Sequence, residues 1–336
     1  MDRTDERLSG GLTGDRPAPG TGSGPPEGGL RAAIAAGAFE AHLRRCDFPP
    51  AGTAVACGVS GGPDSLALLV LATAAGLDVT AVHVDHGLRP GSGEDAAVVA
   101  AAAAAAGAGF VGETVRVDPG PNLEARARAA RYGALPAGAL LGHTADDRAE
   151  TVLLNLLRGA GLRGTAAMPP ERRRPLLGLR RSDTLEVCRL AGLSPVADES
   201  NLDRAFRRNR VRLDVLPLLD EVFERDVVPL LCRHAALARE AVQALDEAAD
   251  GLDPTDAAAL AAAPRALARW ALHRWITEGR AGDERHPPDS AAVDRALAVA
   301  RGEARGADVG CGWSVRRRAG RLRLEPPAAS PAGLPD

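Results

Sequence analysis

The stretch Ala54-Val-Ala-Cys-Gly-Val-Ser-Gly-Gly-Pro-Asp-Ser65 decides the fold of this chain. Its first half is a short apolar run that predicts a buried strand, and its second half is a loop of small residues. The apolar segment 66–72 predicts a helix directly after the loop. Small residues between a strand and a helix let backbone N–H groups close around an anion, which the helix N-terminus also attracts. We therefore expect a phosphate-binding loop here; a Gly-rich turn with a Ser or Asp helix cap is the alternative.

The chain contains no lysine: all 41 of its basic residues are arginine. A phosphate-binding loop of the Walker type needs a lysine that reaches the outer phosphates. A Walker NTPase is therefore excluded, and so is any enzyme that depends on a Schiff-base lysine. The length of 336 residues is typical of about two domains.

The cysteine pattern and the lack of long apolar runs predict a cytoplasmic protein. The five cysteines are scattered, and no pair has the spacing of a metal or redox site, which is typical of a reduced compartment. No stretch resembles a secretory signal, and no apolar run is long enough for a membrane span. We therefore expect no contact with a membrane.

Predicted strands and helices alternate in the first half of the chain. We expect strands at 54–59, 79–84, 110–117 and 139–143, and helices at 64–75, 94–107, 123–132 and 144–158. This alternation predicts an α/β fold with a parallel sheet and helices on both faces. Ligands of such sheets bind beyond the carboxyl ends of the strands.

The composition divides the chain into four segments. We expect a disordered tail over 1–28, a catalytic domain over 29–217 that opens with a helix at 30–46, a smaller helical domain over 218–325 that binds the substrate or a nucleic acid, and a frayed tail over 326–336. The smaller domain should contain helices at 218–249, 256–278 and 290–301, and it should end in a β-hairpin at 311–324.

Polar motifs follow two of the predicted strands. His83 and Asp85 end the second strand and point to the same side of it, because they are two residues apart. A turn with an incidental histidine is the alternative. After the fourth strand, Asp146 and Glu150 form an acidic pair on the first turns of a helix. Carboxylates near a triphosphate are repulsive unless they hold Mg²⁺ or a substrate ammonium.

Helix capping is the alternative for part of the second motif. Thr144 with Asp147 three residues later resembles a capping box, with Asp in place of Glu or Gln. Capping accounts for these two residues without chemistry. It does not account for Asp146 and Glu150.

Arginines are clustered, although the formal net charge is −3. Clusters lie at 172–174, 180–181, 204–212 and 316–323. Local patches, rather than net charge, decide contact with phosphates, and arginine suits bidentate phosphate binding. Arg208 and Arg212, four residues apart and next to Asn209, would share a helix face. A solvated helix is the alternative.

These motifs together carry a family resemblance. Residues Ser60–Ser65 resemble the pyrophosphate-binding loop (PP-loop) of the N-type ATP pyrophosphatase superfamily. Within that superfamily, the chain resembles the tRNA(Ile)-lysidine synthetase family over about residues 53–220. The resemblance rests on the segments 60–65, 82–89, 124–132, 142–164, 174–177 and 198–212, the last running into Leu216-Pro-Leu-Leu219. The C-terminal part resembles the family's small C-terminal domain more loosely, and we expect the second C-terminal domain of longer members to be absent.

The resemblance implies a PP-loop fold and a ligase reaction. ATP adenylates the ring 2-carbonyl oxygen of the wobble cytidine in the isoleucine tRNA with a CAU anticodon. The ε-amine of free L-lysine then displaces AMP and gives lysidine. Mg²⁺ is implied together with ATP.

The resemblance also implies roles for particular residues. Ser60, Gly61, Gly62, Pro63, Asp64, Ser65, His83 and Asp85 are expected to bind ATP; Asp64 and Asp147 to hold Mg²⁺ or the pyrophosphate; Asp146 or Glu150 to bind the lysine ammonium; and Arg208, Asn209 and Arg212 to bind phosphates of the nucleotide or the tRNA. His83 and His143 are candidates for the group that deprotonates the lysine amine.

Two other functions stay open at this point. A tRNA thiolase would share the adenylation but needs a reactive or cluster-binding cysteine, whereas Cys57 lies in a predicted buried strand and no CxxC is present. A non-catalytic adenosine-nucleotide sensor would leave the acidic and histidine motifs without a purpose. The sequence leaves the oligomeric state open, a homodimer included.

Overall fold

The structure, a computed structural model, describes residues 29–85, 92–115, 126, 130, 132–168, 173–196, 202–280 and 287–327. The predicted tail 1–28 and most of the predicted helix 123–132 lie outside these residues, as do residues 86–89 and 198–201 of two motifs. The chain divides into two compact units, residues 1–144 with 172–198 and residues 145–171 with 199–336. These units are defined by packing, whereas the predicted catalytic domain 29–217 is a functional division and stays a prediction.

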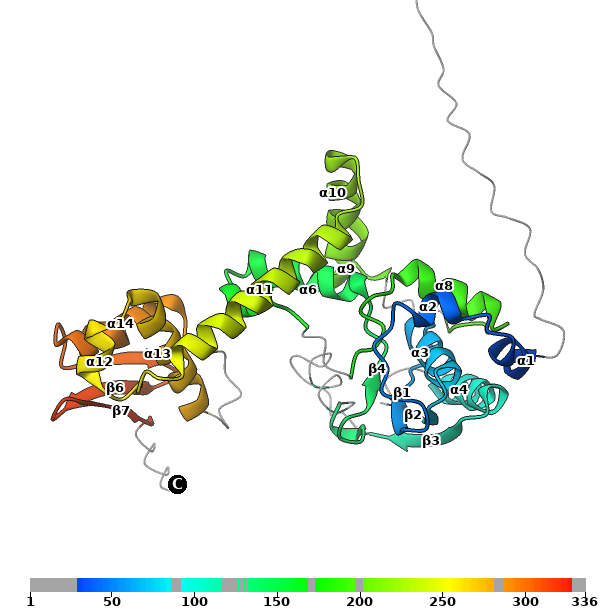
Figure 1. Cartoon of the computed structure of the whole chain (residues 1–336), viewed down its shortest axis with the longest axis horizontal. Helices are drawn as coiled ribbons and strands as arrows, with labels where there is room; N and C mark the ends of the chain where they lie inside the picture. The colour runs from blue at the N-terminus through cyan, green and yellow to red at the C-terminus, as the bar shows by residue number, and fades with distance from the viewer. Residues whose placement is uncertain are drawn as a thin grey trace, which may run out of the picture. The chain divides into compact units, whose positions relative to one another are not determined.

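The first unit contains a four-stranded parallel sheet, which confirms the predicted α/β fold class. Its strands are β1 (Ala54–Gly58), β2 (Asp78–Asp85), β3 (Gly109–Thr114) and β4 (Leu140–Leu141), in the order β3-β2-β1-β4 (Figure 1). β1 is central and pairs with β2 and β4. The chain therefore leaves the carboxyl end of β1 in the middle of the sheet, where this fold binds ligands.

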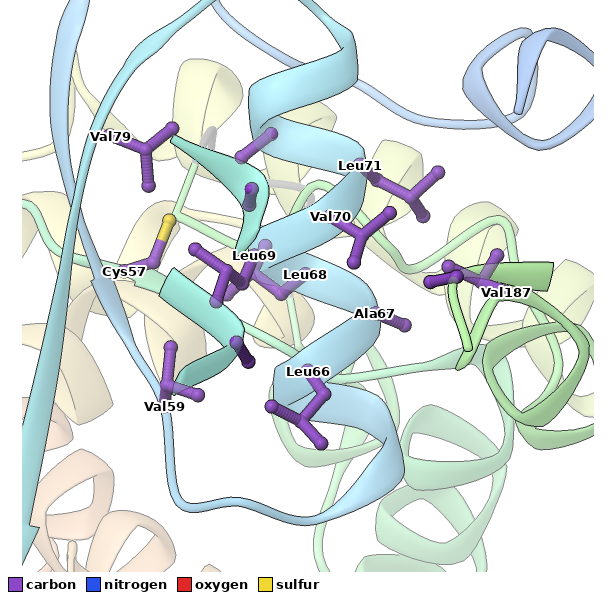
Figure 2. Packing of buried hydrophobic residues seen from close by; sticks show 14 of the residues in the cluster. Cys57, Val59, Leu66, Ala67, Leu68, Leu69, Val70, Leu71, Val79 and Val187 are labelled. Carbon is purple, nitrogen blue, oxygen red and sulfur yellow. The ribbon is translucent and has the colours of Figure 1, made fainter. Parts of the chain in front are cut away.

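Helix α3 (Pro63–Ala74) follows the loop after β1 and forms the core of this unit. All of its residues from Ser65 to Ala72 are buried. One side packs on Cys57 and Val79 of the sheet, and Val187 of α8 (Arg181–Leu190) belongs to the same apolar cluster (Figure 2). A helix covered on several sides must be apolar nearly all round. Burying one such leucine side chain contributes about 1.5–3 kcal/mol, so the start of α3 is firmly fixed.

The strands of the sheet alternate between two apolar clusters. Residues at odd positions of β2, such as Val79 and Ala81, belong to the cluster with α3 and α4 (Ser92–Ala106). Val82 and Val84 belong to a second cluster with Leu135 and Leu141. This is the two-residue period of a strand that is covered on both faces.

The predicted helix 30–46 is two short helices, α1 (Gly29–Ala35) and α2 (Glu40–Leu43). Gly37 between them has φ +73°, a left-handed conformation that interrupts a helix and favours glycine.

The second unit begins with α6 (Ala145–Leu157) and the short helix α7 (Leu162–Thr165). It continues with α9 (Arg207–Arg210), the π-helix η2 (Val211–Val215), α10 (Leu216–Phe223) and α11 (Val228–Ala249). Ala145, Ala149 and Leu153 on one face of α6 pack against Val211 and Val228. This packing lays α6 beside the segment that carries the arginine cluster.

The predicted helices 218–249 and 256–278 are each interrupted, which corrects the sequence analysis. Glu224 ends α10 with φ +51°, and the Asp226 carboxylate then accepts the Val228 N–H at the start of α11. Pro264 separates α12 (Ala257–Ala262) from α13 (Arg265–Gly279), because proline cannot donate the N–H that a continuous helix needs.

The chain ends in α14 (Ser290–Arg301) and a three-stranded antiparallel sheet. The predicted hairpin is present as β6 (Trp313–Arg318) and β7 (Arg321–Glu325), while β5 (Gly306–Gly310) was not predicted. The sheet packs with α12, α13 and α14 around a separate apolar cluster that includes Leu260, Leu272 and Leu297. Within the part of the chain that the structure describes, no helix is both long and apolar enough to cross a membrane.

Candidate active site

The loop between β1 and α3 is closed by its own hydroxyl groups. The Ser65 hydroxyl accepts the backbone N–H of Ser60 at 3.1 Å and donates to the Gly62 carbonyl at 2.9 Å. Gly61 has φ +88°, and its carbonyl accepts the N–H of Val196 at 3.0 Å. Among the described residues, no side chain caps the N-terminus of α3. The loop therefore has the preformed shape and the uncapped helix end that suit an anion.

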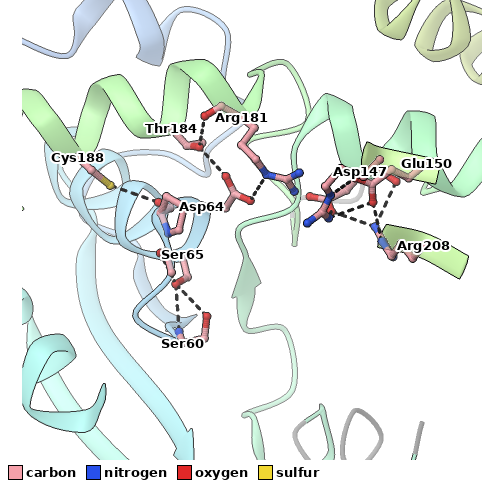
Figure 3. Close-up of polar contacts among 12 residues, drawn as sticks. Ser60, Asp64, Ser65, Asp147, Glu150, Arg181, Thr184, Cys188 and Arg208 are labelled. Atoms are coloured by element: carbon pink, nitrogen blue, oxygen red, sulfur yellow. Dashed lines mark hydrogen bonds and ion pairs between the residues drawn. The ribbon is translucent and has the colours of Figure 1, made fainter. Parts of the chain in front are cut away.

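Asp64 lies in the first turn of α3 and is held from α8 (Figure 3). The Thr184 hydroxyl is 2.5 Å from Oδ1 of Asp64, and Nε of Arg181 is 3.3 Å from Oδ2. Thr184 is fully buried, whereas a fifth of the Asp64 side chain is exposed. Neither contact could be predicted from the sequence, because Thr184 and Arg181 lie 120 and 117 residues from Asp64.

Gly142 lets the end of β4 approach the start of α3. A Cβ atom at this position would lie 2.6 Å from the Asp64 carbonyl oxygen and 3.1 Å from the Ser65 nitrogen. Only glycine fits that separation, so the segment after β4 supports the loop directly.

The predicted histidines lie near the carboxyl ends of the strands. His83 in β2 is buried, and its Nδ1 is 2.9 Å from the Val59 carbonyl oxygen. Because a carbonyl only accepts, Nδ1 carries the proton, and Nε2 of the neutral ring is the acceptor. His143 is half-buried, with Nε2 3.4 Å from the Tyr132 hydroxyl. Asp85 ends β2 and is half-buried.

The second unit contains an acidic and basic cluster that joins α6 to the arginine segment. Nε of Arg208 lies 2.7 Å from Oε2 of Glu150, and Nε of Arg212 lies 2.6 Å from Oε1. Nη2 of Arg208 also lies 2.9 Å from Oδ1 of Asp147 (Figure 3). The prediction that Arg208 and Arg212 share a face agrees with this geometry, because both reach the same carboxylate.

The charges of this cluster balance, and its burial makes that balance necessary. Glu150 is fully buried and Asp147 nearly so. Two carboxylates face two guanidinium groups, which is how proteins hold charge away from water. Burial lowers the pKa of Arg208, but the charges of Asp147 and Glu150 more than offset it, so the pKa stands above its ordinary value.

Two further predicted residues are sequence neighbours of this cluster. Asp146 is half-buried in the first turn of α6. Asn209 is buried, and its amide donates to the Asp203 carbonyl at 2.8 Å, which fixes the turn before α9. Arg212 lies in the π-helix, a local widening that is frequent at functional sites.

The residues present fit Mg²⁺ only as an ion that arrives with phosphates. Among the described residues, no group of three or more His, Cys, Asp or Glu side chains could hold a metal by itself. Mg²⁺ is usually held by one or two carboxylates together with substrate phosphates. Asp64, partly exposed beside the loop, fits that pattern. Asp147 fits it less well, since its side chain is only 11% exposed, against 20% for Asp64.

Comparison with known proteins identifies the family of this chain. Residues 38–219 match the family model described as the PP-loop domain. A tRNA(Ile)-lysidine synthase of Nocardia farcinica is 43% identical over 310 residues, covering 85% of this chain and 96% of the relative. One of Salinispora tropica is 42% identical over 315 residues, covering 83% and 92%.

One similar solved structure is the U34-tRNA thiolase NcsA from Methanococcus maripaludis with its [4Fe-4S] cluster. Its TM-score is 0.48 at 14% identity, and the match covers 62% of this chain and 81% of the thiolase. A similarity this distant carries no functional argument.

Proposed function

Because the chain belongs to the tRNA(Ile)-lysidine synthase family of PP-loop proteins, we propose that it ligates free L-lysine to the wobble cytidine of the isoleucine tRNA with a CAU anticodon. The observation that carries the proposal is the closed anion-binding loop Ser60–Ser65 in a chain that matches such synthases over nearly their whole length. ATP supplies the energy and leaves as AMP and pyrophosphate.

The reaction consists of two displacements. The ring 2-carbonyl oxygen of cytidine attacks the α-phosphorus of ATP; a new O–P bond forms, and the bond between the α-phosphorus and the bridging oxygen breaks. The neutral ε-amine of lysine then attacks the ring 2-carbon. The C–O bond breaks, AMP leaves, and the amine loses a proton. Adenylation is required because an unactivated carbonyl oxygen is a poor leaving group.

The first unit is proposed to hold the nucleotide. The loop residues Ser60 to Ser65 bind the pyrophosphate part of ATP, with His83 and Asp85 near the nucleotide at the end of β2. Mg²⁺, when bound with ATP, neutralises phosphate charge as the pyrophosphate leaves. Asp64 is the carboxylate that supports this role best, since it is partly exposed beside the loop.

Of the two carboxylates predicted for the lysine ammonium, Asp146 is the better candidate. Glu150 is fully buried, and both of its oxygens already accept from Arg208 and Arg212. An incoming ammonium would have to displace a guanidinium there. Asp146 is half-buried on the first turn of the same helix.

The proton of the lysine amine is proposed to pass to a histidine. The Val59 carbonyl fixes the proton of His83 on Nδ1 and leaves Nε2 as an acceptor. His143 remains the second candidate. A bell-shaped pH profile that loses its acidic limb on replacement identifies the base.

Arg208, Asn209 and Arg212 are proposed to contact phosphates of the nucleotide or the tRNA. Each guanidinium has five N–H donors, so an arginine that pairs with a carboxylate can also contact a phosphate. The fractional exposure of the Arg208 side chain, 30%, supports such a contact. Asn209 supports it less directly, because its amide fixes the turn before α9.

The segment 218–325 is proposed to bind the tRNA through its terminal hairpin. Arg316, Arg318, Arg321 and Arg323 form what we call the outer hairpin face, on the side opposite the buried Val315 and Leu322. In the register of β6 and β7, Arg316 lies opposite Arg323, and Arg318 lies opposite Arg321. Like charges placed opposite each other destabilise a sheet. A bound phosphate backbone offsets that repulsion.

Among the residues that the structure describes, acidic partners are found for two arginines of the outer hairpin face. Arg316 pairs with Glu325 at 2.9 Å, and Arg321 pairs with Asp253. Arg318 and Arg323 are exposed. Because the proposed reaction uses tRNA and ATP, we propose that the enzyme is cytoplasmic. A homodimer, which the sequence left open, is a separate proposal that light scattering tests.

The thiolase alternative is disfavoured by the two cysteines beside the loop, Cys57 in β1 and Cys188 in α8. Its sulfur chemistry needs a reactive thiol, but Cys57 is fully buried, and burial raises the pKa of its thiol to about 12. Cys188, which contacts the Pro63 carbonyl, has a pKa raised to about 12 by burial and by the charge of Asp64.

The test incubates the purified protein with ATP, radiolabelled lysine and bulk bacterial tRNA. We expect label in tRNA only with ATP, and this label should survive mild alkali, because a C–N bond resists hydrolysis that cleaves an aminoacyl ester. An Asp64→Asn variant should incorporate little label. Absence of alkali-stable label under any condition would overturn the proposal.

A further inference from the structure

We infer that Thr184, with Arg181, is a positioning residue that holds the Asp64 carboxylate away from the anion-binding N–H groups of the loop. Those groups then remain open to the pyrophosphate part of ATP. The inference rests on the proposed function, since that function makes pyrophosphate the ligand.

An aspartate in the first turn of a helix has a strong local alternative. The first N–H groups of a helix have no partner within the helix, and a nearby carboxylate readily accepts from them. A phosphate-binding loop uses these same donors for its ligand. Asp64, in the first turn of α3, would therefore compete with the phosphate if its side chain folded back.

The contacts from α8 oppose that alternative. Oδ1 of Asp64 faces the Thr184 hydroxyl at 2.5 Å, and Oδ2 faces Nε of Arg181 at 3.3 Å, so both oxygens are engaged from the α8 side (Figure 3). The Thr184 oxygen also lies 2.9 Å from the Arg181 carbonyl. A hydroxyl has one proton, and the shorter contact to the charged carboxylate is the stronger of the two.

Loop closure does not depend on Asp64. Ser65 performs it, by accepting from Ser60 and donating to Gly62. The chain thus separates two tasks that one side chain could have combined: Ser65 shapes the loop, and Asp64 is held beside it.

The first turn of α8 is itself anchored. Asp183 accepts the Arg180 N–H at 2.6 Å and the Arg45 guanidinium at 2.8 Å. Arg45 also donates to the Gly178 carbonyl, and a Cβ atom on Gly178 would lie 2.2 Å from the Arg45 carbonyl oxygen. These contacts fix the place from which Thr184 reaches Asp64.

This anchoring gives a role to a motif that the reaction itself does not use. The segment 174–177 precedes α8, and its Leu176 is fully buried in the core, as is Leu179 just after it. We infer that the segment and α8 together form a support for Asp64.

The test measures binding of inorganic pyrophosphate by calorimetry, in EDTA so that no metal contributes. Thr184→Val keeps the shape and removes the hydroxyl, and it should weaken binding about tenfold, the worth of one hydrogen bond to a charged group. Thr184→Ser keeps the hydroxyl and should stay within about twofold of the parent. Unchanged binding by Thr184→Val, or an equal loss in Thr184→Ser, would overturn the inference.

A second arm separates positioning from a general structural effect. Asp64→Ala removes the competing carboxylate, so it should bind metal-free pyrophosphate at least as tightly as the parent. Thr184→Val should then have no further effect in the Asp64→Ala background. The same tenfold loss in that background would show that Thr184 acts without Asp64. Thr184→Ala replaces Thr184→Val in this cycle if the valine variant does not fold.

Neither arm uses tRNA or lysine, so the two hypotheses fail separately. Failure to form lysidine would sink the proposed function and leave the pyrophosphate result standing. If the protein forms lysidine but the variants do not show the predicted differences in pyrophosphate binding, only the positioning role of Thr184 is overturned.

Discussion

Glu150 of α6 and Arg212 of η2 form a buried ion pair, with 2.6 Å between Oε1 and Nε. Arg208 completes the pairing on the other oxygen. Removing the Glu150 charge leaves the buried cluster with two guanidinium groups and one carboxylate, that of Asp147. Glu150→Gln should therefore lower the free energy of unfolding by about 3–5 kcal/mol, measured by urea denaturation. Glu221→Gln, at an exposed position of α10, is the matched control and should change it little. Equal stability of the two variants would contradict the account.

Gly142 is the residue where a single methyl group should disturb the loop. A Cβ atom there would lie 2.6 Å from the Asp64 carbonyl, so Gly142→Ala must displace the start of α3. We expect weaker ATP binding. The free energy of unfolding should also fall by roughly 1–3 kcal/mol, as for other overpacked sites. Gly133→Ala meets no atom within 4 Å and should retain ATP binding. Normal ATP affinity in Gly142→Ala, measured by calorimetry, would show that the loop does not depend on this approach.

Asp183 should make a pH-dependent contribution to stability. Burial alone would raise the pKa of Asp183, but the Arg180 N–H and the Arg45 guanidinium more than offset it and hold the pKa below its ordinary value. Since the folded pKa is depressed, the contribution is present above the unfolded pKa of about 3.9 and is lost as the pH falls through the folded pKa. Asp183→Asn should thus be less stable by about 1 kcal/mol at neutral pH.

The stability difference between the parent and Asp183→Asn should stay constant from about pH 7 to about pH 5 and shrink below about pH 3.9. Chemical denaturation across this range measures it. A difference that grows toward acid pH would have the wrong sign for a depressed carboxyl pKa.

The outer hairpin face should contribute to tRNA affinity but not to folding. Replacing Arg318 and Arg323 with Gln removes two phosphate contacts, so binding should weaken and the slope of log K against log salt should fall by about 1–2. Thermal stability should stay equal or rise, because like charges no longer face each other. Arg189→Gln, on the exposed side of α8, is the control. An unchanged salt slope in a filter-binding assay would argue against tRNA contact at this face.

Much of the fold could be predicted because it depends on local patterns. The apolar run 54–59, the small residues after it and the buried helix are contiguous in sequence, and they appear as β1, the loop and α3. The break at Pro264 was missed by the prediction of one helix over 256–278, although proline seldom occurs inside a helix. β5 gave little signal, because its Gly306-Ala-Asp-Val-Gly310 sequence is short and rich in glycine.

The site was predicted less completely, because its support comes from distant segments. Asp64, Asp147 and Glu150 stand in recognisable motifs, but nothing near Thr184 indicates that its hydroxyl reaches Asp64 from 120 residues away. The same holds for Glu150: the sequence presents it as a free acidic group, and only the packing of α6 against η2 makes it the partner of Arg208 and Arg212. The sequence therefore indicates which side chains can take part in the chemistry, but only the folded structure shows which of them are accessible to a substrate.

Lysidine formation is detected by the mass of the modified nucleoside in the tRNA product. The isoleucine tRNA with a CAU anticodon is incubated with the protein, ATP and lysine, and the digested tRNA is analysed by mass spectrometry. The wobble cytidine alone should gain the mass of one lysine less one water, with one AMP released for each cytidine modified. A wobble cytidine that keeps its mass while ATP is consumed, or one that exchanges oxygen for sulfur, would contradict the proposed function.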